Sequence, residues 1–188
     1  MKTAVIILAV LLVGGLVAGG KFISVRNDLA TQNVAVSAAW AQVEVVLQRR
    51  ADLVPNLVET VKGYAKQEKD VFISVANARA ALAGARTPQE KIAAHSEIGT
   101  ALARLLVVVE QYPQLRSSEN FQRLQDELAG TENRIAVERR KYNETLQKYN
   151  TQIVLFPNNI VASLSGFKHN DAYIRTEPGA RVAPTVAF

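Results

Sequence analysis

The chain has no cysteine and only two histidines among its 188 residues. The missing thiols exclude disulfide bonds, cysteine-based zinc sites and a cysteine nucleophile together. They leave the redox state of the compartment open. His95 has Gly99 four residues further on, where a metal pair on one helix face would need a second ligand. We therefore expect no metal and no cofactor.

Recognised catalytic motifs are also missing. The sequence contains no glycine-rich phosphate loop, no serine-centred elbow and no nucleophile-and-base spacing. Carboxylates such as Glu132 and Glu138 stand on expected helices, where side chains at this density are usually solvated or paired. We expect no catalytic residues and no enzymatic activity, and an unrecognised hydrolase is the remaining enzymatic hypothesis.

Charge of one sign is nowhere concentrated. The net charge is +5, acidic and basic residues are interspersed, and the longest basic run is residues 139–141. A nucleic-acid-binding protein normally shows a basic stripe with aromatic residues beside it. Here the aromatic residues fall on apolar helix faces, so we expect no nucleic-acid partner.

One stretch, residues 3–20, carries no charge at all. Phe22 and Ile23 extend it to the ~20 residues that a bilayer crossing needs. A cleaved signal peptide is the alternative, because small residues end the stretch. Its length and the retained Met1 favour an uncleaved anchor over residues 1–23. The two sides of the stretch carry nearly equal numbers of basic residues, so the positive-inside rule hardly distinguishes the two orientations. The two-residue head most simply stays in the cytoplasm, which predicts an extracytoplasmic main domain.

Beyond the anchor, apolar residues recur in alternating steps of three and four, the spacing that keeps one helix face toward a partner. We call this series the seam. It comprises Leu29, Val36, Trp40, Val43, Leu47, Val54, Leu57, Val61, Tyr64, Val71, Val75 and Leu82, interrupted by Asn33, Arg50 and Glu68, with the small Ala78. The seam predicts buried helix.

Pro55 stands inside the seam. Proline breaks or kinks a helix, yet fits the first turn of a new one. The unbroken spacing favours one kinked helix, whereas the need to bury a stripe on each segment favours a hairpin at residues 52–56. We predict the hairpin, with a second helix from Pro55 to Leu82 that stops near Gly84.

The remaining elements follow from helix signals. Thr87-Pro88, with Glu90, predicts the start of a third helix whose apolar face is Ile98, Leu102, Leu105, Val109 and Tyr112, ended by Pro113. A long fourth helix is expected over 119–154, where Gly130 suggests a close approach of another helix. A short apolar helix is expected at 160–167, before an extended or disordered tail at 168–188.

Three blocks resemble the LemA family of bacterial membrane proteins. They are RRADLVPNLVETVKGYAKQEKDVF at 49–72, EQYPQL at 110–115 followed by the run at 119–150, and FPNNIVASLSGFK at 156–168. With the anchor they cover nearly the whole chain. The resemblance implies an all-α fold, an antiparallel four-helix bundle over 24–156 behind a single transmembrane helix, with 157–188 as short helix and tail. It implies no known enzymatic activity. One branch of the family is associated with magnetosome membranes, and this chain lacks the long extra segment that would place it there.

Two functions are expected on these grounds. The first is a single-pass protein of the bacterial inner membrane whose helical domain scaffolds or self-assembles, with the lipid bilayer and further copies as partners. The second is an adaptor that docks a neighbouring membrane protein, such as a protease. Polar residues concentrate around one glycine-containing segment, and we predict an interaction patch of Arg49, Arg50, Glu132, Arg134, Arg139 and Arg140. Surface pairs and interhelical hydrogen bonds are the alternative reading of these residues.

Overall fold

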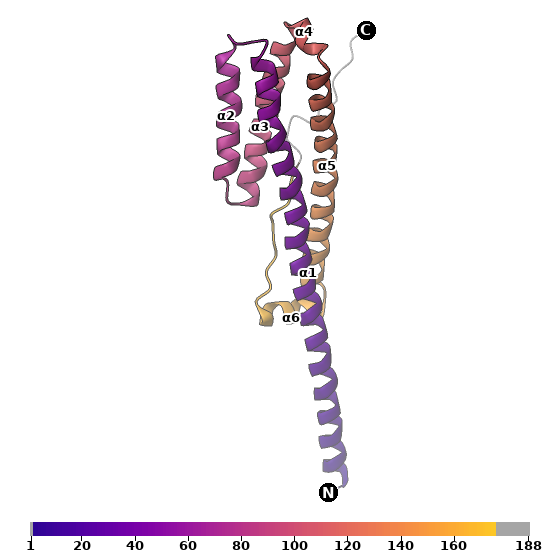
Figure 1. Ribbon diagram of the computed structural model, residues 1–188. Coiled ribbons are helices and arrows are strands. Elements are labelled where there is room, and N and C mark those ends of the chain that lie inside the picture. The colour runs from indigo at the N-terminus through magenta and orange to yellow at the C-terminus, as the bar shows by residue number, and fades with distance from the viewer. Residues whose placement is uncertain (1, 176–188) are drawn as a thin grey trace, which may run out of the picture. The chain divides into compact units, whose positions relative to one another are not determined.

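The computed structural model describes residues 2–175, and every regular element among them is a helix. The helices are α1 (Lys2–Lys62), α2 (Lys69–Gly84), α3 (Pro88–Glu110), α4 (Pro113–Arg116), α5 (Glu119–Val154) and α6 (Asn158–Ser165) (Figure 1). The all-α prediction is confirmed for this part of the chain. The described residues fall into two compact units: one combines 2–39 with 142–171, and the other combines 40–141 with 172–175.

Helix α1 continues through Pro55, so the predicted hairpin at 52–56 is wrong. A proline inside a helix costs ~3 kcal/mol. Val54 and Leu57 flank it and are at most 1% exposed, and burying each contributes ~1.5–3 kcal/mol. The helix that continues through Pro55 keeps both side chains in the core, so their burial offsets the cost of the proline. The chain reverses later, between α1 and α2, and Tyr64 of the predicted seam lies in that turn with 47% of its surface exposed.

The start of α3 follows the sequence signal. Thr87 Oγ1 accepts a hydrogen bond from the Glu90 backbone N–H at 3.2 Å, and the Glu90 carboxylate accepts from the Thr87 N–H at 3.0 Å. The Arg86 N–H also donates to this carboxylate, at 2.7 Å. These backbone donors, Arg86 first and then Thr87, lower the pKa of Glu90. The capping box fixes the short connection between α2 and α3, and Pro113 occupies the first turn of α4.

The unit that contains residues 40–141 has one continuous apolar core. Its buried members come from five helices, α1 to α5. They are Ala51, Val54, Leu57, Val61, Val75, Ala78, Ile98, Ala101, Leu102, Leu105, Val108, Val109, Leu115, Phe121 and Leu124, with Ala65 from the turn after α1. Three seam positions of α1 belong to this core, and so do four residues of the predicted α3 face, as their spacing predicted: Val54, Leu57 and Val61, with Ile98, Leu102, Leu105 and Val109. Tyr112, beyond the end of α3, packs against the core and is partly buried.

Helix α5 spans the residues that its periodicity predicted. Ser118 Oγ accepts a hydrogen bond from the Phe121 N–H at 3.3 Å and so satisfies one free donor of the first turn. The expectation of a close helix approach at Gly130 is wrong, because a Cβ built there meets no atom within 4 Å. The glycine lies on an exposed face of the helix.

The other unit packs the end of α5 and helix α6 against α1. Val25 and Leu29 of α1 form a small core with Val161 and Ala162 of α6, and Phe22, Ile153 and Phe167 pack on it. Gly166 follows α6 with φ at +77°, a left-handed conformation that glycine adopts without strain. The predicted short helix and its end near Gly166 are confirmed.

Two side chains of α5 hold the chain that follows α6. The Asn150 amide donates to the Asn170 carbonyl at 2.7 Å and accepts from the Asn170 N–H at 3.0 Å. The Tyr149 hydroxyl donates to the Lys168 carbonyl at 3.2 Å, and burial raises the pKa of Tyr149. Residues 168–175 are non-helical, as expected, and the rest of the predicted tail lies outside the described residues.

The start of α1 is apolar and uncovered. Its most hydrophobic window is long enough to span a membrane and no part of it is buried. Helix α3 is also long and apolar enough to span a membrane, but 44% of its most hydrophobic window is buried and eight of its residues are buried. We therefore treat α1 as the candidate span and α3 as a core helix.

Candidate functional site

Arg50 is the one cation on the seam of α1, between Leu47 and Val54. Its neighbours on the seam are at most 2% exposed, and the side chain of Arg50 itself is only 13% exposed. A charge so placed needs partners, because burial of an unpaired ion costs several kcal/mol. Two other helices provide them, His95 from α3 and Glu132 from α5.

The three side chains meet at one atom of the guanidinium. Arg50 Nη1 lies 3.0 Å from His95 Nε2 and also donates to Glu132 Oε2 in a salt bridge. His95 is 6% exposed, whereas the Glu132 side chain is 50% exposed. Among the described residues, no acceptor pairs with the buried Nε of Arg50. The cluster thus connects α1, α3 and α5, buried at the histidine and open to water at the carboxylate.

The arginine decides the tautomer of His95. A guanidinium only donates and stays protonated, so Nε2 must accept and the ring proton of the neutral imidazole must sit on Nδ1. The pKa of His95 is lowered to about 4, chiefly by burial and in addition by the charges of Arg50 and Arg139. His95 is therefore neutral at physiological pH.

This protonation state predicts a pH-dependent stability. The unfolded chain binds a proton at His95 more readily than the folded chain between pH 6.5 and about 4. The contribution of neutral His95 to the free energy of unfolding is fully present above this window and is lost as the pH is lowered through it. The free energy of unfolding is therefore expected to be about 2 kcal/mol lower at pH 5 than at pH 8. Denaturant unfolding of the full chain in detergent, followed by circular dichroism at both pH values, measures the loss.

His95→Gln is the matched control for that prediction. The glutamine oxygen accepts from Arg50 and does not titrate. Between pH 8 and pH 5, the variant is expected to lose about 2 kcal/mol less of its free energy of unfolding than the parent chain. An equal pH dependence in both proteins would contradict the assignment of His95 as the titrating group.

Five of the six residues predicted as one patch line two different grooves, and Arg140 borders neither of them. Arg50, Glu132 and Arg139 border an open groove of about 450 Å³ together with His95, and Arg139 Nη2 donates to the Arg175 carbonyl there at 2.9 Å. Arg49 and Arg134 border a separate groove of about 310 Å³ with Arg123, Asp126, Glu127, Gly130 and Thr131. Arg140 is exposed and has an interaction partner. Arg50 and Glu132 come together as a salt bridge, and docking by the six residues stays a prediction.

His95 was not among the residues predicted for this site. The signal was present, because His95 stands three residues before Ile98 and continues the three-and-four series of Ile98, Leu102, Leu105 and Val109. Arg50 interrupts the α1 seam in the same way. Two polar residues at core positions of two apolar stripes indicate a buried polar contact.

The chemistry of the cluster is that of a structural or recognition site. Within the described residues, no group of three or more His, Asp or Glu side chains is placed to hold a metal. The His95 ring nitrogen that carries the lone pair already accepts a hydrogen bond from Arg50, so this lone pair is not directed at the groove. The partly exposed Arg50–Glu132 pair is instead suited to polar contacts with another surface.

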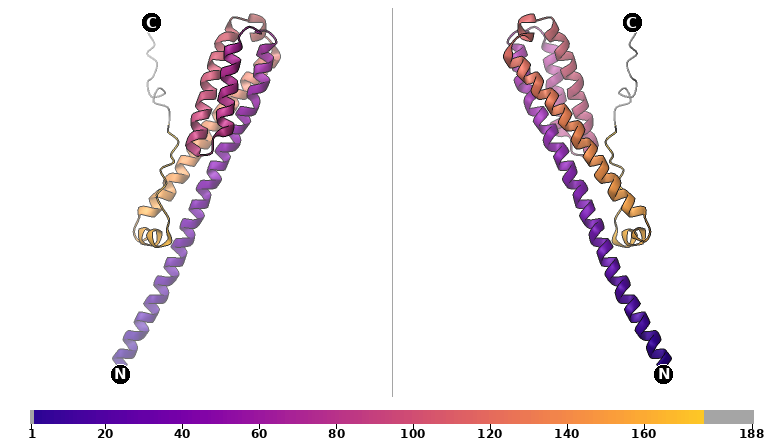
Figure 2. Two further views of the ribbon diagram at one scale, coloured as in Figure 1. Left: turned by 90° about the vertical axis from the view of Figure 1, so that its left-hand side faces the viewer. Right: turned by 90° about the vertical axis from the view of Figure 1, so that its right-hand side faces the viewer.

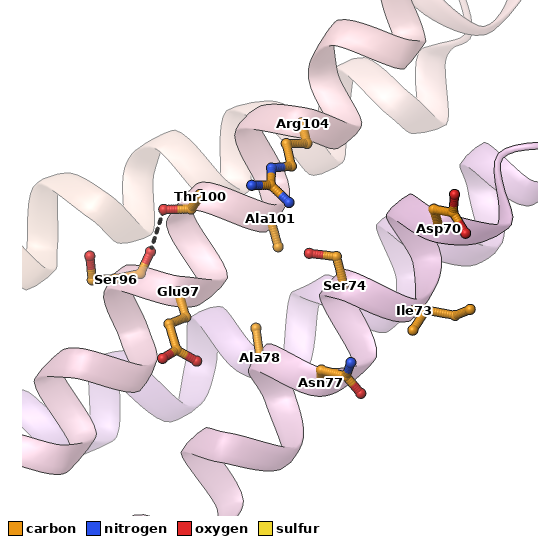
Figure 3. A pocket seen from close by; sticks show the side chains of 10 residues that line it. All are labelled: Asp70, Ile73, Ser74, Asn77, Ala78, Ser96, Glu97, Thr100, Ala101 and Arg104. Carbon is orange, nitrogen blue, oxygen red and sulfur yellow. Dashed lines mark hydrogen bonds between the residues drawn. The ribbon is translucent and has the colours of Figure 1, made fainter.

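A third groove, of about 510 Å³, lies between α2 and α3 (Figure 3). Small side chains, Ala78 and Ala101, face each other across it, with Arg104, Glu97 and Asp70 around them. The Thr100 hydroxyl donates to the Ser96 carbonyl at 3.2 Å, within its own helix. This lining is open and of mixed charge, and it resembles an ordinary interhelical groove.

The family model for the LemA family matches residues 39–188, which include every residue of the Arg50–His95–Glu132 cluster. The chain belongs to the LemA family. The predicted resemblance is therefore confirmed. The match begins after the apolar start of α1, so the family assignment rests on the helical domain and not on the span.

Several LemA-family relatives are similar in sequence. Magnetosome protein MamQ 2 of Paramagnetospirillum magneticum is 29% identical over 178 residues, covering 81% of this chain and 65% of that protein. Magnetosome protein MamQ of Magnetospirillum gryphiswaldense is 27% identical with the same coverage. Protein LemA of Metamycoplasma hominis is 22% identical over 142 residues, covering 75% of this chain and 65% of the relative. The chain spans about two thirds of the length of these relatives.

Proposed function

We propose that this chain is a non-enzymatic, single-pass membrane protein whose helical domain assembles with further copies of itself and so acts as a scaffold. In this proposal the domain is an antiparallel bundle of four long helical segments on the outer side of a bacterial inner membrane. The observation that carries the proposal is the continuity of α1, whose uncovered apolar start leads without a break into the core of the domain.

The length of the uncovered segment supports membrane attachment. Val5 to Val17 contain ten large apolar side chains that are each at least 58% exposed in the structure. Exposure of this much apolar area to water is unfavourable by ~25 cal/mol per Å², and burial in lipid removes that cost. Relatives named as magnetosome proteins are consistent with a role at a membrane.

Self-assembly is supported by a second stripe on α1. Val34, Ala38, Ala41 and Val45 are all exposed and follow one another in steps of four, three and four. No charged residue occurs between Asp28 and Glu44. The valines are 67% and 62% exposed, so this stripe is separate from the buried seam. Such spacing, with small residues that permit close approach, is typical of a helix that meets another helix.

Anchoring favours a second copy as the partner of this stripe. Anchors that insert in the same direction hold neighbouring copies parallel, so the same residues of α1 face each other in a two-fold pair. The stripe is uncharged, and its contact with itself brings no like charges together. A two-fold contact between α1 helices is therefore the simplest form of assembly.

Cysteine crosslinking tests the proposal in the membrane. The chain has no cysteine of its own, so Ala41→Cys introduces a single thiol on the stripe. Mild oxidation of membranes that contain this variant is expected to give a disulfide-linked dimer. Ala76→Cys, exposed on α2, is the matched control and should stay monomeric.

The crosslinked product also separates the two candidate functions. A dimer from Ala41→Cys alone supports self-assembly. Capture of a different polypeptide through a bifunctional thiol reagent would favour the adaptor role, and the absence of any specific product would argue against both. Recovery of the parent chain in the soluble fraction would contradict membrane attachment.

A further inference from the structure

Helix α6 has an exposed apolar face that its own core does not use. Val161 and Ala162 face α1 and are at most 6% exposed, whereas Ile160 is 52% and Leu164 is 73% exposed. Ile160 and Leu164 are four residues apart and share one helix face. Helix α6 therefore buries one side against α1 and presents apolar side chains on another.

The residues before α6 enlarge this apolar surface. Val154, Leu155 and Phe156 are 62%, 48% and 81% exposed. Five large apolar side chains within residues 154–164 are thus open to the surroundings. A concentration of this kind on a protein surface usually marks an interaction site.

The contact with α1 places α6 at the end of the candidate span. Val25 and Leu29 pack against α6, and Phe22 joins the same core. The uncharged stretch ends at Gly20, and Ile23 is the last residue of the expected crossing. At 1.5 Å per residue, Val25 lies ~3–8 Å beyond these two residues. The headgroup region of a bilayer has about this thickness, and interfacial helices insert ~5–10 Å.

The direction of α6 fits the same location. It crosses α1 at a steep angle, and both side views show it nearly end-on (Figure 2). A helix that crosses a membrane-spanning segment in this way lies roughly along the membrane surface. Lys21, Arg26 and Lys168 are exposed and directly adjoin the core residues Phe22, Val25 and Phe167. Cations at this level meet lipid phosphates, although Asp28 adds one opposing charge.

We propose that α6 and the residues before it form a second membrane contact, with Phe156, Ile160 and Leu164 inserted into the lipid interface beside the span of α1. This inference rests on the proposed membrane attachment and adds a site to it. Lipid is the occupant because the patch adjoins the end of the span and because basic side chains border it. The contact would fix the angle of α1 at the membrane and keep the end of α5 at the surface.

Site-directed fluorescence tests this contact in the full chain. Leu164→Cys, labelled with the environment-sensitive dye NBD, is reconstituted in vesicles of phosphatidylcholine and phosphatidylglycerol. Its emission is expected to shift to shorter wavelength and to be quenched by a lipid that carries a nitroxide near the headgroup. The labels at Ser163→Cys, on the adjoining polar face, and at Ile73→Cys, exposed on α2, are expected to show weaker quenching by lipid and stronger quenching by aqueous iodide.

Three results would overturn the inference, and they differ in what else they affect. A blue-shifted Leu164 label that the lipid nitroxide does not quench would show that protein, such as a second copy, covers α6. A Leu164 label that behaves like the Ile73 label would show that α6 faces water. Both leave the span intact if a label at Leu11→Cys is quenched by deep nitroxide lipids. An unquenched Leu11 label would overturn the proposed membrane attachment together with this inference.

Discussion

Arg50→Ala is expected to lower the free energy of unfolding by about 3 kcal/mol. The substitution removes the aliphatic stem that packs on the seam and leaves the buried Nε2 of His95 without its donor. Glu132 is half-exposed and returns to water at little cost. For a chain of this length the change corresponds to a melting temperature lower by ~6–12 °C. Thermal unfolding of the full chain in detergent, followed by circular dichroism, measures it.

Two control variants separate packing from polar pairing. Arg50→Met keeps most of the aliphatic stem and leaves only the His95 ring nitrogen without its hydrogen-bond donor. The free energy of unfolding should therefore fall by about half as much as in Arg50→Ala. Adding His95→Leu removes the unsatisfied acceptor and should restore stability to near the parent value. If Arg50→Ala unfolded within 1 °C of the parent chain, the cluster would not be buried as described.

Pro55→Ala is expected to stabilise the protein by about 1–3 kcal/mol. The proline stands inside α1 and cannot donate to the carbonyl of Ala51, which lies four residues earlier and is 6% exposed. Alanine restores this hydrogen bond and relieves the contact of the ring with the preceding turn. Denaturant unfolding of the parent chain and the variant in the same detergent provides the comparison.

Pro88→Ala is the matched control for the proline prediction. Pro88 stands in the first turn of α3, where the missing N–H would have no helical partner. The substitution there should give no gain. A destabilised Pro55→Ala would mean that the core around Val54 and Leu57 depends on the proline, which would contradict our account of α1.

The helical elements were largely predictable because their determinants are local. The limits of α5, the capping box at Thr87 and the short helix that ends before Gly166 all follow from residues within a few positions of one another. The seam of α1 was equally clear, since its spacing alone indicated which side is buried. Local propensity and pattern agree at these positions.

The errors came from choices that only long-range packing decides. Pro55 permits either a kink or a break, and the deciding term is the burial of Val54 and Leu57 against other helices. Gly130 was given a packing role that its open surroundings do not support. Neither outcome depends on neighbours in sequence.

The candidate site could be predicted only in part from the sequence, because its assembly also depends on long-range packing. The pairing of Arg50 with Glu132 could be suspected from their charges. The division of five of the six residues between two grooves depends on how α1, α3 and α5 are rotated. His95 could have been included from its place on the α3 stripe. Its role appears only when a second stripe with a polar interruption is brought against it.

The mass of the full-length protein, extracted from membranes with its surrounding lipid, tests the central claim most directly. Mass photometry of polymer-bounded lipid particles should show a defined assembly of more than one copy. Val34→Glu combined with Val45→Glu places charges on the exposed stripe and should reduce this assembly to single copies. Ile73→Glu, an equally exposed apolar position on α2, should leave it unchanged. A parent chain that is monomeric at every concentration, with the same mass as the double variant, would contradict self-assembly.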